Sequence, residues 1–205
     1  MSDKDPPFTP EGTVGPFYPG VFAAAMKTDL STVAPLLVHR PAGECVSLSG
    51  RFLDSGGLPV RSVIIEAWQA NAFGRYRSPR DTSSRPLDPH FEGFARLRTD
   101  GEGRYHLITI KPGPHPVPGG SVMRAPHLRL SIFVSGIDRI VTHVFFEGEA
   151  LNDTDPVLSS IPDPDVRRRL IARRAVEPAD PGVTAYTLDI VMRGRGETPF
   201  FDDWY

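Results

Sequence analysis

The sequence predicts a mainly β protein: an antiparallel β-sandwich with an extended N-terminal arm and one or two short helices. The chain of 205 residues contains 22 prolines and 19 glycines, which divide it into short pieces and favour strands and turns over long helices. Between these breaks lie seven short segments of strand character. That number and spacing are typical of an antiparallel sandwich rather than a parallel α/β sheet.

Clusters of turn-forming residues separate the expected strands, because Gly, Asp and Ser readily adopt the backbone angles that tight turns need. The clearest clusters are Asp54-Ser55-Gly56-Gly57, Asp100-Gly101-Glu102-Gly103 and Ser135-Gly136-Ile137-Asp138. We expect strands at residues 46–53, 60–69, 95–99, 104–110, 127–134, 139–146 and 184–192.

Two helices are expected. One is short, near Phe22 to Lys27, and the other begins at Asp163-Pro164, an acidic N-cap before a proline at the first helical position, and continues to about Arg174. Residues 1–20 have the composition of an extended arm, and residues 77–94, rich in Ser, Pro, Asp and Arg, are typical of a long surface loop. We therefore expect a single domain, 1–205, in which residues 21–205 form the sandwich core with its long loops.

Composition narrows the function classes. Hydrophobic residues make up 40% and charged residues 23% of the chain, and the formal net charge is -2, which gives no electrostatic reason to expect nucleic acid or a membrane as a partner. The arginines at 167–169 and 173–174 are interpreted as the solvated face of the second helix. One cysteine, Cys45, cannot form an internal disulfide. With no apolar leader and no run of membrane-spanning length, a cytoplasmic location is expected.

The segment His127-Leu128-Arg129-Leu130-Ser131-Ile132-Phe133-Val134 alternates apolar and polar residues as a half-buried strand does. Residues two apart in a strand point the same way, so His127 and Arg129 share one face. A His-x-His pair at this spacing would direct two imidazoles at one metal ion. Here an arginine, which cannot be a ligand, occupies the second position.

Three segments upstream give this substitution a context: Gly74-Arg75-Tyr76-Arg77, Ile110-Lys111-Pro112-Gly113-Pro114-His115-Pro116 and Arg124-Ala125-Pro126-His127. In this order they resemble the iron-site segments of the intradiol ring-cleaving dioxygenases, in which two tyrosines and two histidines hold a ferric ion. Tyr76 and His127 match two ligand positions, while His115 stands at the second tyrosine and Arg129 at the second histidine. The resemblance extends to residues 145–148 and 194–201 and implies the sandwich of the intradiol dioxygenase type.

Within this family the chain looks like the alpha subunit of the two-chain enzymes that cleave 3,4-dihydroxybenzoate with O2, in which the homologous beta subunit carries the iron. At an effective dielectric of about 20, a unit charge ~4 Å from a trivalent ion costs up to roughly 12 kcal/mol. This is comparable with the ~10–16 kcal/mol apparent binding energy of a good structural metal site. We therefore expect Tyr76, His115, His127 and Arg129 to be vestigial metal-site positions, with no metal in this chain and Fe(III) in the partner beta subunit.

The resemblance also implies substrate-binding residues. In the alpha subunits an N-terminal segment lies over the iron site of the beta subunit, so Thr13, Gly15 and Pro16 are candidates for contact with the small aromatic catechol. Related alpha chains commonly carry an arginine at the position of Ser135, where it can meet the substrate carboxylate. The loss of that guanidinium leaves the identity of the substrate open.

Two alternatives stay open. The chain could be a self-sufficient dioxygenase with metal on Tyr76, His115 and His127, or a non-catalytic sandwich module that binds carbohydrate or a partner. Each of these three residues also has an ordinary interpretation, as a packed aromatic, a loop residue and a sheet histidine bonded to the backbone. The histidines at 39, 90, 106 and 143 show no pattern of partners.

The C-terminal aromatics Phe200, Phe201, Trp204 and Tyr205 are expected either to fold back onto the sandwich or to bury against a partner.

Overall fold

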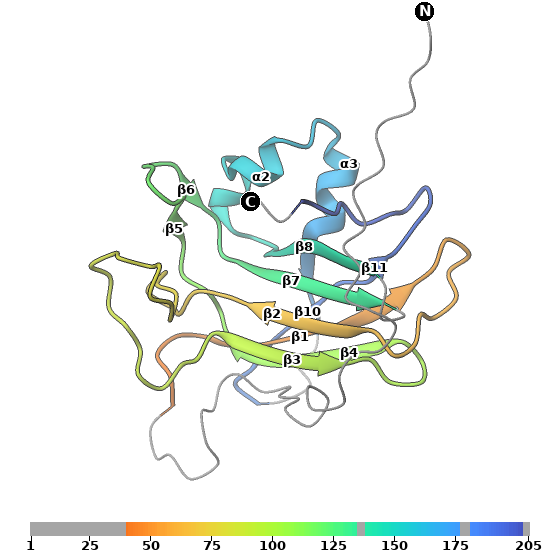
Figure 1. Cartoon of the computed structure of the whole chain (residues 1–205), viewed down its shortest axis with the longest axis horizontal. Coiled ribbons are helices and arrows are strands. Elements are labelled where there is room, and N and C mark those ends of the chain that lie inside the picture. Colours follow the sequence, from red (N-terminus) through yellow and green to blue (C-terminus); the bar gives the residue numbers. More distant parts are fainter. Residues whose placement is uncertain (1–39, 135–137, 177–180, 203–205) are drawn as a thin grey trace, which may run out of the picture.

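The structure of the chain is a computed structural model, and it describes residues 40–134, 138–176 and 181–202 (Figure 1). The predicted N-terminal arm with Thr13, Gly15 and Pro16, the helix expected near residues 22–27, and Ser135 lie outside the described residues.

Strands dominate this part of the chain, and its helices are single turns. The strands are β1 (Cys45–Leu53), β2 (Ile64–Trp68), β3 (Phe94–Arg98), β4 (Arg104–Ile110), β5 (His115–Pro116), β6 (Met123–Arg124), β7 (His127–Val134), β8 (Asp138–Phe146), β9 (Ile171–Arg174), β10 (Thr184–Thr187) and β11 (Ile190–Val191). The helical turns are η1 (Ala150–Asp153), α2 (Pro156–Ser159), α3 (Pro164–Arg167) and η2 (Arg168–Leu170).

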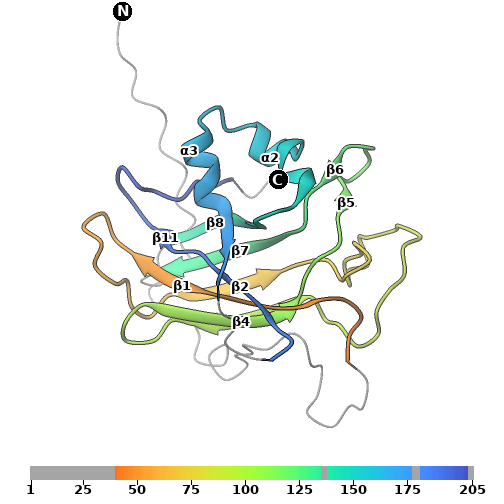
Figure 2. The same ribbon diagram turned by 180° about the vertical axis from the view of Figure 1, so that it is seen from behind.

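Nine strands form one sheet in the order β11-β1-β10-β9-β8-β7-β2-β3, with β4 paired to β1. Its path folds over, so that β1 and β4 lie behind β2 and β7 in Figure 1 and in front of them in Figure 2. Most pairs are antiparallel, as predicted, but β9 runs parallel to β8, and β10 and β11 run parallel to β1. The β8–β9 pair is reached through η1, α2, α3 and η2, the kind of crossover that a parallel pair requires.

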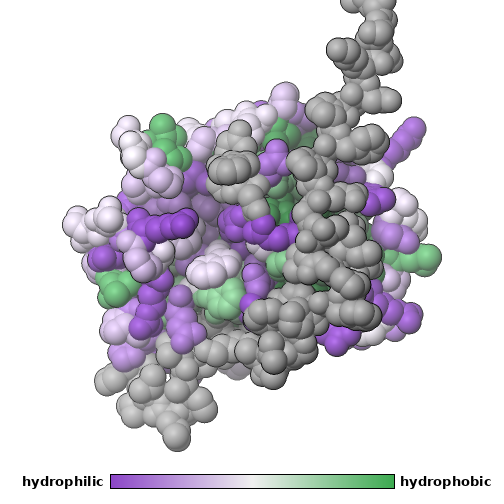
Figure 3. Space-filling model, viewed as in Figure 1, coloured by the Kyte–Doolittle hydropathy of each residue, from purple (hydrophilic) through white to green (hydrophobic). Residues whose placement is uncertain are grey.

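The core lies between these two layers and follows the predicted alternation. In β7, Leu128, Leu130 and Ile132 are at most 2% exposed and face the core. A second, smaller cluster lies between the other face of the sheet and the helical turns; its buried members are Ala125, Phe145, Val157, Leu158 and Leu170. Where the described residues are visible in Figure 3, hydrophilic side chains predominate and apolar ones are scattered among them. Burial of apolar surface in these two clusters is the main stabilising contribution.

The predicted helix from Asp163 to Arg174 is wrong in its second half. Its start is confirmed, since the Asp163 carboxylate accepts a hydrogen bond from the backbone N–H of Asp165 at 2.8 Å and Pro164 follows it. After η2, however, the chain enters β9, in which Ala172 is fully buried. β9 pairs with β8 on one side and with β10 on the other. These backbone hydrogen bonds favour the strand over a short helix, which is only marginally stable in water.

Two predicted strands are shorter than expected. The strand predicted at 60–69 begins only at Ile64, because Ser62 adopts a positive φ of 59° that a strand does not allow. The segment 184–192 divides into β10 and β11 at Leu188, whose N–H bonds to Ser49 O and whose carbonyl accepts the Tyr105 hydroxyl at 2.7 Å. No helix in the described part of the chain is long and apolar enough to cross a membrane.

Candidate functional site

The β7–β8 hairpin places the first half of the candidate site. In its register His127 lies opposite Phe145 and Arg129 opposite His143. Directly opposed residues of an antiparallel pair project from the same face, and alternate residues along each strand do so too. His127, Arg129, His143 and Phe145 therefore share the face away from the main core.

Two loops bring Tyr76 and His115 to this face. They approach closely at Gly74 and Gly113, where no larger residue would fit, since a Cβ at Gly74 would lie 2.2 Å from Pro114 O. Gly74 also needs its positive φ of 75°, which glycine adopts without strain. Beyond this close approach, the backbone N–H of Tyr76 donates to Asp81 Oδ2 at 2.7 Å, and the Tyr76 hydroxyl comes within 3.4 Å of His115 Nε2.

Four side-chain rings consequently follow one another across the site, and we call them the ring cluster. The centroid distances are 5.1 Å for Tyr76–His115, 5.2 Å for His115–His127 and 5.3 Å for His127–His143. The three ring residues proposed as metal positions thus lie together, with the fourth position, Arg129, across from His143. Sequence reasoning missed His143, although the turn expected between residues 127–134 and 139–146 implies a register from which its position opposite Arg129 could have been counted.

The histidines differ in their hydrogen bonds. His127 Nδ1 lies 2.7 Å from Ala125 O and His115 Nδ1 lies 3.0 Å from Pro116 O. A carbonyl only accepts, so both Nδ1 atoms carry the proton and both Nε2 atoms are left as acceptors. His143 is 1% exposed, and neither of its ring nitrogens has a hydrogen-bond partner in the described part of the chain.

A buried ion pair lies next to the ring cluster. Arg124, 7% exposed, donates from Nε to Asp155 Oδ2 at 2.8 Å, and Asp155 is fully buried. The same carboxylate oxygen accepts the backbone N–H of Ala125, while Oδ1 caps α2 by accepting the N–H groups of Val157 and Leu158. Sequence reasoning missed this pair, since no local pattern links residues 124 and 155.

Burial and nearby guanidinium groups keep the ring cluster uncharged. Burial, reinforced by Arg124, places the pKa of His127 well below its usual value, and burial with Arg124 and Arg129 lowers the pKa of His143 to about 3. Burial also lowers the pKa of His115. For Tyr76, burial outweighs the two guanidinium groups and raises the pKa to about 12. At neutral pH the site is a set of neutral rings beside two cations.

These residues do not fit a ferric ion of the family type. Ferric iron favours anionic oxygen donors, and at the four positions Tyr76 is the one phenol. Arg129 adds a permanent positive charge at the position where the resemblance leads us to expect the second histidine ligand. Within residues 40–134, 138–176 and 181–202, no group of three or more His, Cys, Asp or Glu side chains could hold a metal ion.

The C-terminal segment closes one side of the site. The backbone N–H of Phe201 donates to Val141 O at 2.8 Å, and Thr142 Oγ1 donates to Pro199 O at 2.8 Å. The Phe201 ring lies 5.3 Å from His143 and packs against the smaller apolar cluster. This part of the tail folds back onto the sandwich, whereas Trp204 and Tyr205 lie outside the described residues.

The depressed histidine pKa values predict a loss of stability in acid. The unfolded chain binds protons at these histidines near pH 6.5, so stability is fully present above that pH and declines as the pH falls toward the folded pKa, about 3 for His143. Between pH 6.5 and 5, His143 alone should cost about 2 kcal/mol of unfolding free energy. Denaturant unfolding at both pH values measures it. The variant His143→Phe should show a shallower pH dependence, and an unchanged dependence would contradict the assignment.

Comparisons with known proteins bear on this geometry. The family model described as Dioxygenase matches residues 14–194. The chain is 43% identical over 162 residues to the protocatechuate 3,4-dioxygenase beta chain of Burkholderia cepacia, covering 78% of this chain and 68% of that one. It is 36% identical over 203 residues to the protocatechuate 3,4-dioxygenase alpha chain of Pseudomonas putida, covering 96% of each chain.

A solved structure agrees with both relatives. The dioxygenase domain of a dioxygenase carbohydrate-binding protein fusion from Streptomyces sp. SirexAA-E aligns with a TM-score of 0.57 at 26% identity, covering 89% of this chain and 96% of that domain. The expected fold type is thereby confirmed. Because the family model spans most of the sequence and both relatives exceed 30% identity, this chain belongs to the intradiol ring-cleavage dioxygenase family.

Proposed function

We propose that this chain is the non-iron alpha subunit of a cytoplasmic protocatechuate 3,4-dioxygenase. Its beta partner would hold Fe(III), and the complex would cleave 3,4-dihydroxybenzoate with O2 to 3-carboxy-cis,cis-muconate. The observation that carries the proposal is the Arg129 guanidinium, which lies opposite His143 beside a cluster of neutral rings, at the position that resembles the family's second histidine. Similarity to an alpha chain over 96% of both sequences supports it.

In this proposal the chain contributes binding and enclosure. The N-terminal arm, with Thr13, Gly15 and Pro16, would cover the iron site of the beta subunit, where glycine permits close approach and the threonine hydroxyl offers one hydrogen bond. Ser135 would lie near the substrate carboxylate and offer a hydroxyl where related alpha chains offer a guanidinium. A hydroxyl is the weaker partner for a carboxylate, so preference for the carboxylated catechol would come from other residues of the complex.

Joint purification with a beta-type chain tests the proposal. We expect a stable complex with about one iron per alpha–beta pair, with ring cleavage only when both chains are present. Rates on 3,4-dihydroxybenzoate and on catechol, which lacks the carboxylate, would show whether the carboxylate is recognised. If no complex forms, or if this chain leaves ring cleavage by the beta chain unchanged, a non-catalytic sandwich module becomes the better account.

A second candidate is a self-sufficient dioxygenase. It is favoured by the 43% identity to a beta chain and by the adjacency of Tyr76, His115 and His127. The Nε2 atoms of both histidines are acceptors, and that of His115 lies 3.4 Å from the Tyr76 hydroxyl. Iron analysis of the chain purified alone discriminates between the two. Stoichiometric iron, with a visible absorption band from a bound phenolate, would establish the self-sufficient enzyme and reject the accessory role.

A further inference from the structure

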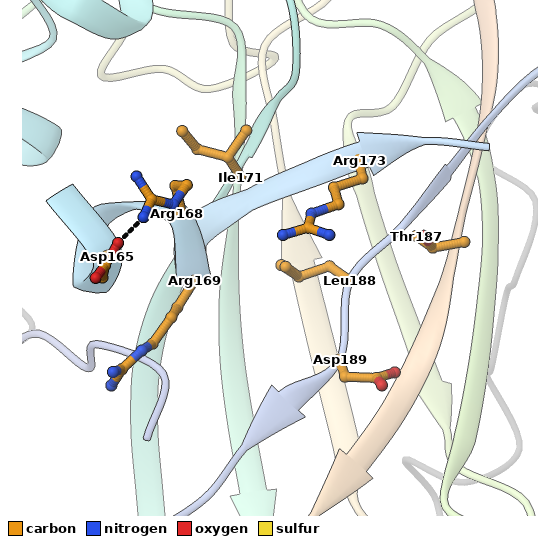
Figure 4. Close-up of a pocket in the computed structure, with 8 residues that line it drawn as sticks. All are labelled: Asp165, Arg168, Arg169, Ile171, Arg173, Thr187, Leu188 and Asp189. Carbon is orange, nitrogen blue, oxygen red and sulfur yellow. Dashed lines mark ion pairs between the residues drawn. The ribbon is translucent and has the colours of Figure 1, made fainter. Parts of the chain in front are cut away.

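The arginines expected to line one helix instead belong to different elements, and three of them surround a pocket (Figure 4). The pocket, of about 410 Å³, lies between η2, β9 and the β10–β11 connection. Arg168 and Arg169 approach it from η2 and Arg173 from β9, while Ile171 and Leu188 supply apolar surface. We call this pocket the arginine groove.

The guanidinium groups of the arginine groove differ in how many hydrogen-bond and ion-pair partners they have. Arg168 forms an ion pair with Asp165, three residues earlier on the same helical segment. Arg169 donates one Nη1 bond, of 3.0 Å, to Glu197 O, and within the described ranges its other donors have no partner. The Arg173 side chain has no hydrogen-bond or ion-pair partner among the residues that the structure describes.

Asp189, on the far side of the groove, does not serve as the ion-pair partner of Arg173. Asp189 Oδ1 accepts the backbone N–H of Arg51 at 2.8 Å. In Figure 4 its carboxylate points away from Arg173, whose guanidinium lies over Leu188. The groove therefore offers donors from two cations on separate elements: Arg173 lies over the apolar floor, and Arg169, whose side chain extends away from Arg173 in Figure 4, lies at the rim.

A guanidinium matches a carboxylate through two parallel hydrogen bonds, and two such groups on separate elements suit two carboxylates held by one small molecule. The volume falls within the range of small-molecule sites, and Ile171 and Leu188 can cover a short hydrocarbon backbone. We propose that the arginine groove binds a small organic anion with two or more carboxylates on a short apolar backbone. This inference is independent of the proposed function.

Calorimetric titration of the full chain with propane-1,2,3-tricarboxylate, at low and at physiological ionic strength, tests the proposal. We expect one saturable site that weakens as salt screens the charges. Arg173→Gln should lower the association constant about tenfold, the equivalent of one charge-assisted hydrogen bond. Arg173→Lys, which keeps the charge without the planar fork, should fall between the two.

Controls separate this site from general anion binding. Arg98→Gln removes an exposed guanidinium of β3 that bonds to Ser62, and it should bind as the wild type does. Succinamide, without charge, should not bind, and inorganic phosphate should bind more weakly than the tricarboxylate. The proposal fails if no saturable binding occurs, if Arg173→Gln binds unchanged, or if phosphate binds equally well. It also fails if binding to the isolated chain disappears in an alpha–beta complex, because a partner then fills the groove.

Discussion

The double variant His115→Tyr/Arg129→His is expected to bind about one ferric ion per chain, whereas the wild type is expected to bind none. The two substitutions would restore two tyrosines and two histidines at the four positions that resemble the family's iron site. The backbone already brings three of these side chains together, with ring centroids 5.1 and 5.2 Å apart from Tyr76 through His115 to His127.

Charge is the reason for expecting so large a change. Removal of Arg129 would remove a repulsion of roughly 12 kcal/mol at most from a trivalent ion ~4 Å away. The new tyrosine would add a second oxygen donor of the anionic kind that ferric iron favours. The high pKa of Tyr76, about 12, does not prevent this, because a bound cation displaces the proton of its ligand.

Iron analysis and visible absorption spectroscopy after aerobic loading would measure the gain. The single variants should bind far less iron, since each leaves one of the two defects in place. His115→Phe/Arg129→His, which restores the histidine without the phenol, is the matched control for the phenolate band. A folded double variant without iron, or a wild type with as much iron, would contradict the assignment of these four positions.

Most of the fold could be predicted because its signals are local. Alternation in residues 127–134 predicted both the strand and the face shared by His127 and Arg129, and Asp163-Pro164 marked a helix start correctly. The failure at Ile171–Arg174 has a non-local cause, since β9 is a strand only because β8 and β10 flank it.

The candidate site, like the fold, could be predicted where its signals are local and not where they depend on distant segments. The motifs around Tyr76, His115 and His127 carried the resemblance, and the structure places their rings in succession. His143 and Asp155 were missed because their roles depend on pairing across strands and on a contact between segments about thirty residues apart. Local sequence patterns therefore predict a strand more reliably than they predict which residues lie opposite it.

Asp155→Ala is expected to lower the free energy of unfolding by about 3–5 kcal/mol, the usual cost of removing one partner of a buried ion pair. The Asp155 carboxylate is fully buried and accepts four hydrogen bonds, one from Arg124 Nε and three from backbone N–H groups. Its removal would leave the Arg124 guanidinium, itself only 7% exposed, charged and unpaired.

Asp163→Ala is the matched control, because Asp163 also precedes a proline and caps a four-residue helix, but is exposed and accepts one hydrogen bond. Loss of such a cap should cost about 1 kcal/mol. Denaturant unfolding of both variants measures the difference, and equal losses would show that Asp155 acts only as a cap. In an Arg124→Met background Asp155→Ala should cost much less, since no buried cation is then left unpaired. Such coupling would identify the ion pair beneath the ring cluster as the source of the large effect.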